Sequence, residues 1–133
     1  MDDATAQEAN AWLAKARRDL DSARRLLSDT PPYRDTAAYH CQQAAEKAIK
    51  AVLCARGTPF PRSHDLTMLV SLAADALSDV HRLADGAATL TPYATLYRYP
   101  DAVMEPDDAD VAEAMAMAYA FLRAAQDYIG REA

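Results

Sequence analysis

Residues 37–53 read AAYHCQQAAEKAIKAVL, and this stretch decides the fold class of the chain. On a helical wheel it separates into an apolar face and a polar face. The apolar face is formed by Ala38, Cys41, Ala45, Ala48, Ile49, Val52 and Leu53. The polar face carries His40, Gln43, Lys47 and Lys50, at spacings of three and four residues. This period is typical of an amphipathic helix packed against other helices.

We name His40, Gln43, Lys47 and Lys50 the polar stripe. Its donors and positive charge suit an anion or the acidic face of a partner protein. Only one acid, Glu46, occurs in this stretch, at the edge of the stripe. The alternative interpretation is a solvated helix face that does no more than keep the helix soluble.

The composition of the whole chain favours packed helices. Of its 133 residues, 51% are hydrophobic, but only 8% are aromatic and three are glycine. Alanine is abundant, and no stretch shows the strong alternation of apolar and polar residues that β-strands require. We therefore predict a single all-α domain over residues 1–133.

The net charge of −6 argues against a protein that coats nucleic acid nonspecifically. The charge is unevenly distributed along the chain. Residues 14–62 carry ten Lys and Arg against five Asp and Glu, whereas residues 63–133 carry four against twelve. An antiparallel bundle either mixes these two halves or displays them separately.

The two cysteines, Cys41 and Cys54, lie thirteen residues apart on one expected helix. That spacing is about 20 Å along a helix, too far for a disulfide. Neither cysteine has a metal-type spacing to a histidine, and no cofactor or metal is expected. The chain has no signal-peptide pattern and no apolar run of roughly 18 residues, so we expect a soluble cytoplasmic protein without a membrane span.

Five helices are expected from the apolar periodicity and from the residues that stop helices. Their approximate ranges are 5–27, 34–55, a short helix after a cap at Ser63 or His64, 78–97 and 107–129. Gly57 and Gly130 are expected to end the second and fifth helices. Pro92 is expected to kink or restart the fourth. The fold predicted is an antiparallel up-and-down bundle of four long helices plus one short helix.

Three motifs follow one another in a fixed order: HxxQAAEKAxKA at residues 40–51, HDL at 64–66 and YAxxYRYP at 93–100. Together they resemble the HEPN domain, a small helical domain of higher eukaryotes and prokaryotes associated with nucleotide binding. The resemblance covers about residues 8–130. No single motif is specific, because alanine-rich helices are common, but the ordered set is.

The resemblance implies a bundle of four or five helices that usually forms a homodimer. Members of the HEPN family occur in toxin–antitoxin and other defence systems, often encoded beside a minimal nucleotidyltransferase. Many cleave RNA, whereas others are noncatalytic binding or scaffolding modules. The candidate partners are therefore a second copy of the chain, a nucleotidyltransferase, and a nucleotide or RNA.

The ribonuclease motif of active family members is an arginine followed, after four to six residues, by a histidine. Arg98 is the arginine that matches. The histidine would fall at residues 103–105, which are Val, Met and Glu, and no histidine follows His81. The motif is therefore missing, and we favour a protein without enzyme activity.

Two other arrangements would supply a histidine. Arg34 and His40, separated by five residues, match the motif literally. They lie early in the bundle, however, and chance explains the match. The second arrangement is a composite site, in which His40 or His64 lies beside Arg98 from another helix or subunit.

We therefore predict a noncatalytic HEPN-type module that binds a nucleotide, RNA or a nucleotidyltransferase partner in a toxin–antitoxin or defence context. The ligand-binding residues expected are His40, Gln43, Lys47, Lys50 and Arg98. Tyr97 and Tyr99, beside Arg98, are candidates for stacking on a base, and the alternative is that they are half-buried packing residues at the end of the bundle. The alternatives are a metal-independent endoribonuclease toxin with a degenerate or composite site, and a purely homodimeric interaction protein.

Overall fold

The computed structural model describes residues 1–100 and 105–132 of the chain. Across those residues the chain forms five α-helices and two short 3-10 helices, and contains no strand. The α-helices are α1 (Asp3–Ser28), α2 (Arg34–Ala55), α3 (Leu66–Ala73), α4 (Val80–Leu90) and α5 (Asp108–Glu132). The 3-10 helices η1 (Ala74–Ala76) and η2 (Thr91–Ala94) follow α3 and α4. The predicted all-α bundle is confirmed.

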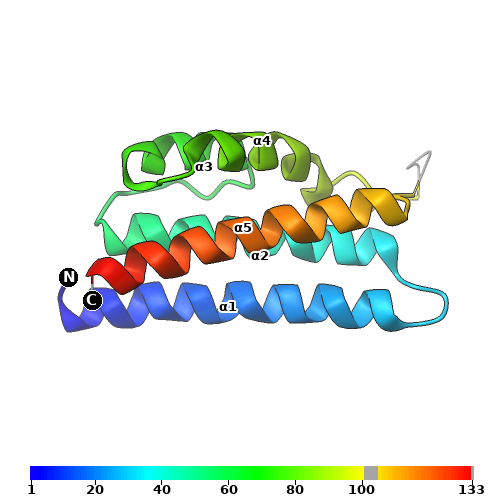
Figure 1. The fold of residues 1–133 in the computed structure, drawn as a ribbon, viewed down its shortest axis with the longest axis horizontal. Coiled ribbons are helices and arrows are strands. Elements are labelled where there is room, and N and C mark those ends of the chain that lie inside the picture. The colour runs from blue at the N-terminus through cyan, green and yellow to red at the C-terminus, as the bar shows by residue number, and fades with distance from the viewer. Residues whose placement is uncertain (101–104, 133) are drawn as a thin grey trace.

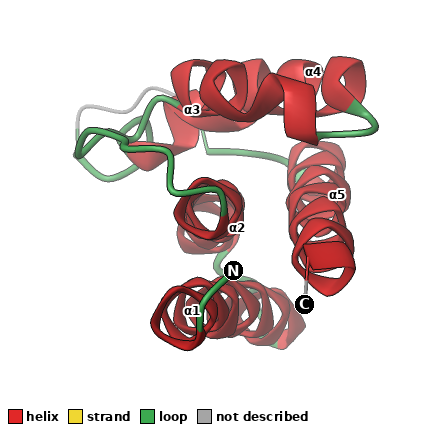
Figure 2. Cartoon of the chain, turned by 90° about the vertical axis from the view of Figure 1, so that its left-hand side faces the viewer, coloured by secondary structure: helices red, strands yellow, loops and turns green. Residues whose placement is uncertain are grey.

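The three long helices run alongside one another, and α3 and α4 form a separate layer over them (Figure 1). Helix α1 runs one way along the bundle and α2 returns, α3 and α4 lie side by side in the second layer, and α5 again runs in the direction of α2 (Figure 1). The end-on view places α2 between α1 and the α3–α4 layer, with α5 beside it (Figure 2). Because α2 and α5 run in the same direction, their N-termini lie at the same end of the bundle.

Helix α2 forms the centre of the core, and fourteen of its 22 residues are buried. Six of those are alanines, whose small side chains allow neighbouring helices to approach closely. Helix α1 faces inward through an apolar seam formed by Ala9, Leu13, Ala16, Leu20 and Ala23. Helix α5 contributes Val111, Ala114, Ala118, Phe121, Leu122, Ala125 and Ile129. Apolar burial of this extent is the main force that stabilises the bundle.

Gly57 stops α2 as predicted, since the helix ends at Ala55 and the φ of Gly57 is +68°. The Gly57 amide donates to the Cys54 carbonyl oxygen at 3.0 Å, and the Thr58 amide donates to the Leu53 carbonyl oxygen at 2.9 Å. This pair of hydrogen bonds is the Schellman motif, which needs a left-handed residue and therefore favours glycine.

Three expected helix ends differ from the structure. The cap of α3 is Asp65, not Ser63 or His64, because the Asp65 carboxylate accepts from the Thr67 and Met68 amides at 3.0 and 3.4 Å. Helix α4 ends at Leu90 and continues only as η2, which begins at Thr91 and has Pro92 in its first turn, as expected for a restart. Helix α5 continues through Gly130 to Glu132, because an exposed glycine lowers helix stability without stopping the helix.

The bundle mixes the two oppositely charged halves of the chain. Arg34 Nε of α2 lies 2.7 Å from Asp108 Oδ1 of α5. Arg56 pairs with Asp75 through both carboxylate oxygens, at 2.9 and 3.0 Å. Both cysteines are free thiols, as the spacing along α2 requires. Among the described helices, none is long and apolar enough to cross a bilayer.

Candidate functional site

The polar stripe of α2 lies against α1, where a buried carboxylate holds two of its members. Asp19 of α1 is only 8% exposed. Its Oδ1 lies 2.8 Å from His40 Nδ1, and its Oδ2 accepts from Lys47 Nζ at 2.6 Å. His40 and Lys47 are both half-buried. One residue of α1 therefore fixes the orientation of both stripe residues at the edge of solvent.

Lys50 lies deeper than the prediction of a binding stripe implied. Its Nζ donates to Glu46 Oε2 at 2.9 Å, and the two side chains are 9% and 5% exposed. The ammonium also lies 5.7 Å from the Trp12 ring centroid and 5.8 Å from that of Phe60. A lysine that is paired with a carboxylate and enclosed by two aromatic rings joins α1, α2 and the loop before α3.

Gln43 is also buried, at 8% exposure, and its amide donates to Gln42 Oε1 at 2.7 Å. Gln42 in turn donates to Glu46 Oε1 and to the His64 carbonyl oxygen, both at 3.2 Å. Side chains of a buried network such as this one position helices rather than meet a ligand. The stripe is therefore divided, with Gln43 and Lys50 inside the domain and His40 and Lys47 at its surface.

Glu46 is the centre of this buried network. His64 Nδ1 lies 2.7 Å from Glu46 Oε1, whereas Lys50 donates to the other carboxylate oxygen, Oε2. Burial raises the pKa of the Glu46 carboxyl, but the hydrogen bonds from Lys50, His64 and Gln42 outweigh burial, and the net pKa is lowered. Glu46 is therefore ionised at neutral pH, and its role is structural. His64, which the sequence analysis considered for a composite site, is bound to Glu46 instead.

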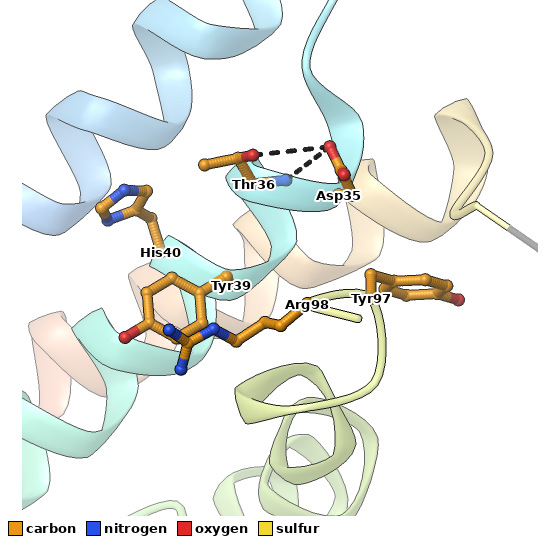
Figure 3. A pocket seen from close by; sticks show the side chains of 6 residues that line it. All are labelled: Asp35, Thr36, Tyr39, His40, Tyr97 and Arg98. Carbon is orange, nitrogen blue, oxygen red and sulfur yellow. Dashed lines mark hydrogen bonds between the residues drawn. The ribbon is translucent and has the colours of Figure 1, made fainter. Parts of the chain in front are cut away.

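A pocket opens where the N-terminal half of α2 faces the segment that follows η2 (Figure 3). Its volume is about 340 Å³, and its lining residues are Asp35, Thr36, Tyr39, His40, Tyr97 and Arg98. The Arg98 guanidinium lies over the Tyr39 ring, 4.7 Å from the centroid. The fold thus brings His40 and Arg98, from two separate sequence motifs, into one pocket.

The chemistry of His40 follows from its partner. A carboxylate only accepts hydrogen bonds, so the Asp19 contact places a proton on His40 Nδ1. The other ring nitrogen, Nε2, is then the atom that exchanges a proton or hydrogen-bonds a ligand. Arg98 adds a permanent positive charge and the planar donor group that fits phosphate. Both groups line the pocket, and the Tyr39 ring lies against each of them, with its centroid 5.5 Å from that of the His40 ring and 4.7 Å from the Arg98 guanidinium carbon.

The pocket also contains a carboxylate, that of Asp35. Its Oδ1 accepts from the Thr36 amide at 2.8 Å and lies 3.5 Å from Thr36 Oγ1. Asp35 lies in the first turn of α2, where the helix dipole stabilises a negative charge. Asp35 therefore adds a negative charge to a lining that also contains the positive charge of Arg98.

A second hollow of about 340 Å³ adjoins the pocket and shares Asp35, Tyr97 and Arg98 with it. Tyr99 lines this hollow and is 62% exposed. Tyr97 instead packs on Tyr93, with ring centroids 5.8 Å apart, and burial raises the pKa of its hydroxyl. Of the two tyrosines beside Arg98, Tyr99 is therefore the one with a ring face open for stacking.

The literal arginine–histidine match at the start of α2 is not a pair in the fold. Arg34 is bound to Asp108 and does not line the pocket that contains His40. Of the positions where the family motif would place its histidine, Glu105 is exposed, and Val103 and Met104 lie outside the described residues. Within residues 1–100 and 105–132, no group of three or more potential ligands could hold a metal ion.

Sequence reasoning missed Asp19, the residue that orients the site. A signal was present: Asp19 lies between the seam residues Ala16 and Leu20, where the apolar period of α1 predicts partial burial. An acid at such a position needs a cationic partner, and the polar stripe of α2 contains two lysines and a histidine that can supply one. Which residues of α2 pair with Asp19 depends on how α1 and α2 are rotated about their axes, and local sequence patterns do not determine that rotation.

The chain is thus an all-α bundle that presents an arginine and a carboxylate-bound histidine on one surface. It belongs to the HEPN domain family, because the model of that family matches residues 9–128. No curated protein matches the chain.

Two solved structures have the same fold. The crystal structure of TT1696 from Thermus thermophilus matches with a TM-score of 0.73 and 29% identity, over 90% of this chain and 97% of that chain. The crystal structure of ST0689, an archaeal HEPN homologue, matches with a TM-score of 0.70 and 26% identity, over 91% of this chain and 97% of that chain.

Proposed function

We propose that this HEPN domain is a noncatalytic module that binds a nucleotide or RNA through the pocket between α2 and the segment after η2. The observation that carries the proposal is the presence of His40 and Arg98 in one pocket, with His40 oriented by Asp19. Lys47, which is not among the lining residues, donates to the same carboxylate and adds a positive charge beside His40. Gln43 and Lys50 enter the proposal only as residues that position α2.

A phosphate group is the part of the ligand that these residues fit best. Arg98 offers paired donors to its oxygens, and His40 offers Nε2. Tyr99 in the adjoining hollow supplies an exposed aromatic ring for a base. A nucleotide combines both parts, which supports a nucleotide or RNA over a simple inorganic anion.

The test is a binding titration of the purified protein with ATP, GTP and a short single-stranded RNA, with cleavage of the RNA followed in parallel. We expect binding without cleavage, weakened about tenfold or more in Arg98→Ala and in His40→Ala. His81→Ala and Arg62→Ala are the matched controls, because both side chains are exposed and line neither hollow. Unchanged affinity in both pocket variants would contradict the proposal.

Lysine variants make a poor test of this site. Removing Lys50 would leave the buried Glu46 without its cation, so a loss of binding would report a damaged fold. Lys47→Ala is cleaner, since Lys47 is half-buried at the surface and His40 remains bound to Asp19.

One observation favours a second function, metal-independent RNA cleavage. The Asp19–His40 pair beside Arg98 combines an oriented proton carrier with a phosphate-binding cation, the two groups that such cleavage requires. RNA cleavage by the wild-type protein that disappears in both His40→Ala and Arg98→Ala would replace the noncatalytic proposal with this one.

We also propose that the protein is a homodimer and that a nucleotidyltransferase, in a toxin–antitoxin or defence context, is its partner. Family membership supports both proposals. Light scattering after gel filtration measures the mass of the assembly, and co-expression with a nucleotidyltransferase encoded by a neighbouring gene tests the partner.

A further inference from the structure

A second positively charged surface lies on α5, and the proposed function does not use it. A groove of about 450 Å³ runs over this helix. Its lining includes Arg82 of α4 and, from α5, Tyr119, Arg123 and Gln126. Ala116 and Ala120 form part of its floor, where their small side chains leave α5 accessible.

Two arginines of α1 border the same groove. The Arg24 guanidinium lies 5.8 Å from the centroid of the Tyr119 ring and hydrogen-bonds the Tyr119 hydroxyl. The Gln126 oxygen, in the amide orientation that satisfies both groups, accepts from Arg17 Nε at 3.1 Å and from Arg17 Nη2 at 3.2 Å. Neutral side chains of α5 therefore hold both guanidinium groups in place.

Four guanidinium groups from three helices thus surround one groove in a protein with a net charge of −6. Of these, Arg24 is the one with an acidic partner, an exposed contact with Asp21 at 3.0 Å. Arg17, Arg82 and Arg123 have no ion pair with any carboxylate among the described residues. Like charges held together without counterions repel, and a bound anion relieves that repulsion.

The carboxylates closest in helical register do not neutralise the groove. Asp85 follows Arg82 by one turn of α4, and Asp127 follows Arg123 by one turn of α5. Both are exposed, and neither lies within ion-pair distance of its arginine. Solvent screens exposed charges at this separation, so these carboxylates oppose a bound phosphate group only weakly.

We propose that the groove formed by Arg17, Arg24, Arg82 and Arg123 over α5 is a second anion site, which binds a run of phosphate groups. Arginine matches phosphate with paired donors, and four arginines fit an oligophosphate or a phosphodiester backbone better than a single phosphate. Tyr119 is 41% exposed at the edge of the groove and offers a ring to an adjacent base. This site is distinct from the His40–Arg98 pocket, with which it shares no lining residue.

The experiment measures fluorescence anisotropy of a labelled single-stranded RNA of about 12 nucleotides. It uses the full chain carrying Arg98→Ala, so that the pocket on α2 contributes little. Inorganic tripolyphosphate and ATP are added as unlabelled competitors. Competition by tripolyphosphate shows that phosphates alone suffice, whereas competition by RNA but not by tripolyphosphate shows that the site needs a phosphodiester strand; both results support the proposal.

The deciding variant is Arg82→Ala/Arg123→Ala, and its control is Lys15→Ala/Arg62→Ala, which removes the same charge from exposed positions outside the groove. We expect the groove variant to bind about tenfold or more weakly, and the control to change little. The slope of log affinity against log salt should become shallower by about 0.7 for each phosphate of a single strand that the variant no longer neutralises. Arg82→Lys/Arg123→Lys should retain the slope, because the charges remain.

Three results would overturn the proposal. The first is an equal decrease of affinity in groove and control variants, which would indicate only general electrostatics. The second is no binding of RNA or tripolyphosphate at low salt by the Arg98→Ala protein. The third is a change in assembly mass caused by the groove variant without any effect on phosphate binding, which would make the groove a protein contact. Circular dichroism confirms in each case that the variant is folded.

Discussion

The side chain that most constrains this structure is Glu46, a buried carboxylate bound by Lys50, His64 and Gln42. An unpaired charge at 5% exposure would be very costly, so each partner is needed for the acid to remain ionised. The rings of Trp12 and Phe60 exclude water from the ammonium group of Lys50. These contacts explain why half of the polar stripe faces inward.

The lowered pKa of the Glu46 carboxyl predicts acid sensitivity. The unfolded chain takes up a proton at Glu46 near the ordinary pKa of 4.5, before the folded protein does. The stability contributed by the network is thus complete above that pH and is lost as pH falls through the folded pKa. Urea unfolding midpoints measured between about pH 3 and 7 should therefore fall on the acidic side.

Glu46→Gln/Lys50→Met removes both buried charges together, which is commonly close to neutral for stability. We expect the urea midpoint of this variant to fall less steeply below about pH 5, the acid limb of the curve. In the control Glu105→Gln, whose side chain is exposed, the acid limb should be unchanged. An acid limb as steep in the double variant as in the wild type would assign the sensitivity to other carboxyls.

Glycine acts at two helix positions with opposite consequences. Gly57 has a φ of +68° and closes α2, whereas Gly130 lies inside α5 with nothing within 4 Å of an added Cβ. A left-handed backbone disfavours any residue with a Cβ, whereas a right-handed helical one favours alanine over glycine. The same substitution should therefore have opposite signs at the two helix ends.

We expect Gly57→Ala to lower the free energy of unfolding by about 1–2 kcal/mol. Gly130→Ala should raise it by up to about 1 kcal/mol, less if the last turn of α5 frays. Urea denaturation of the two variants in parallel checks both signs. A neutral Gly57→Ala would mean that the left-handed turn after α2 is not retained in solution.

In the whole molecule, apolar packing outweighs the ion pairs that join the two charged halves. Arg34–Asp108 and Arg56–Asp75 have good geometry, but the acids are 86% and 78% exposed. Pairs at such exposure are screened and contribute little. The buried alanines and leucines around α2, in contrast, are almost entirely removed from water.

The double variant Asp75→Asn/Asp108→Asn should leave the urea midpoint close to that of the wild type. Leu53→Ala, at a fully buried position of α2, should lower the free energy of unfolding by about 2–5 kcal/mol. Denaturation curves for the two variants under one buffer condition decide between these contributions. A larger destabilisation from the surface acids than from Leu53 would reverse this ranking.

Local sequence signals are enough to predict the helices, their apolar faces and the family. The ends of α2 at residues 34 and 55 and the inward seam of α1 follow from such signals, because periodicity, proline and glycine act within a few residues. The order of the three motifs was sufficient to identify the HEPN family, which the match over residues 9–128 confirms.

Which polar residues meet solvent depends instead on how the helices pack. A helical wheel shows which residues share a face, but not how deeply a neighbouring helix covers that face. Gln43 and Lys50 are buried in a network around Glu46, whereas His40 is held at the surface by Asp19, a residue of another helix. Arg98 lines the same pocket as His40 only because the segment after η2 returns to the N-terminal half of α2. Sites of this kind are built from long-range contacts, which the local sequence pattern does not encode.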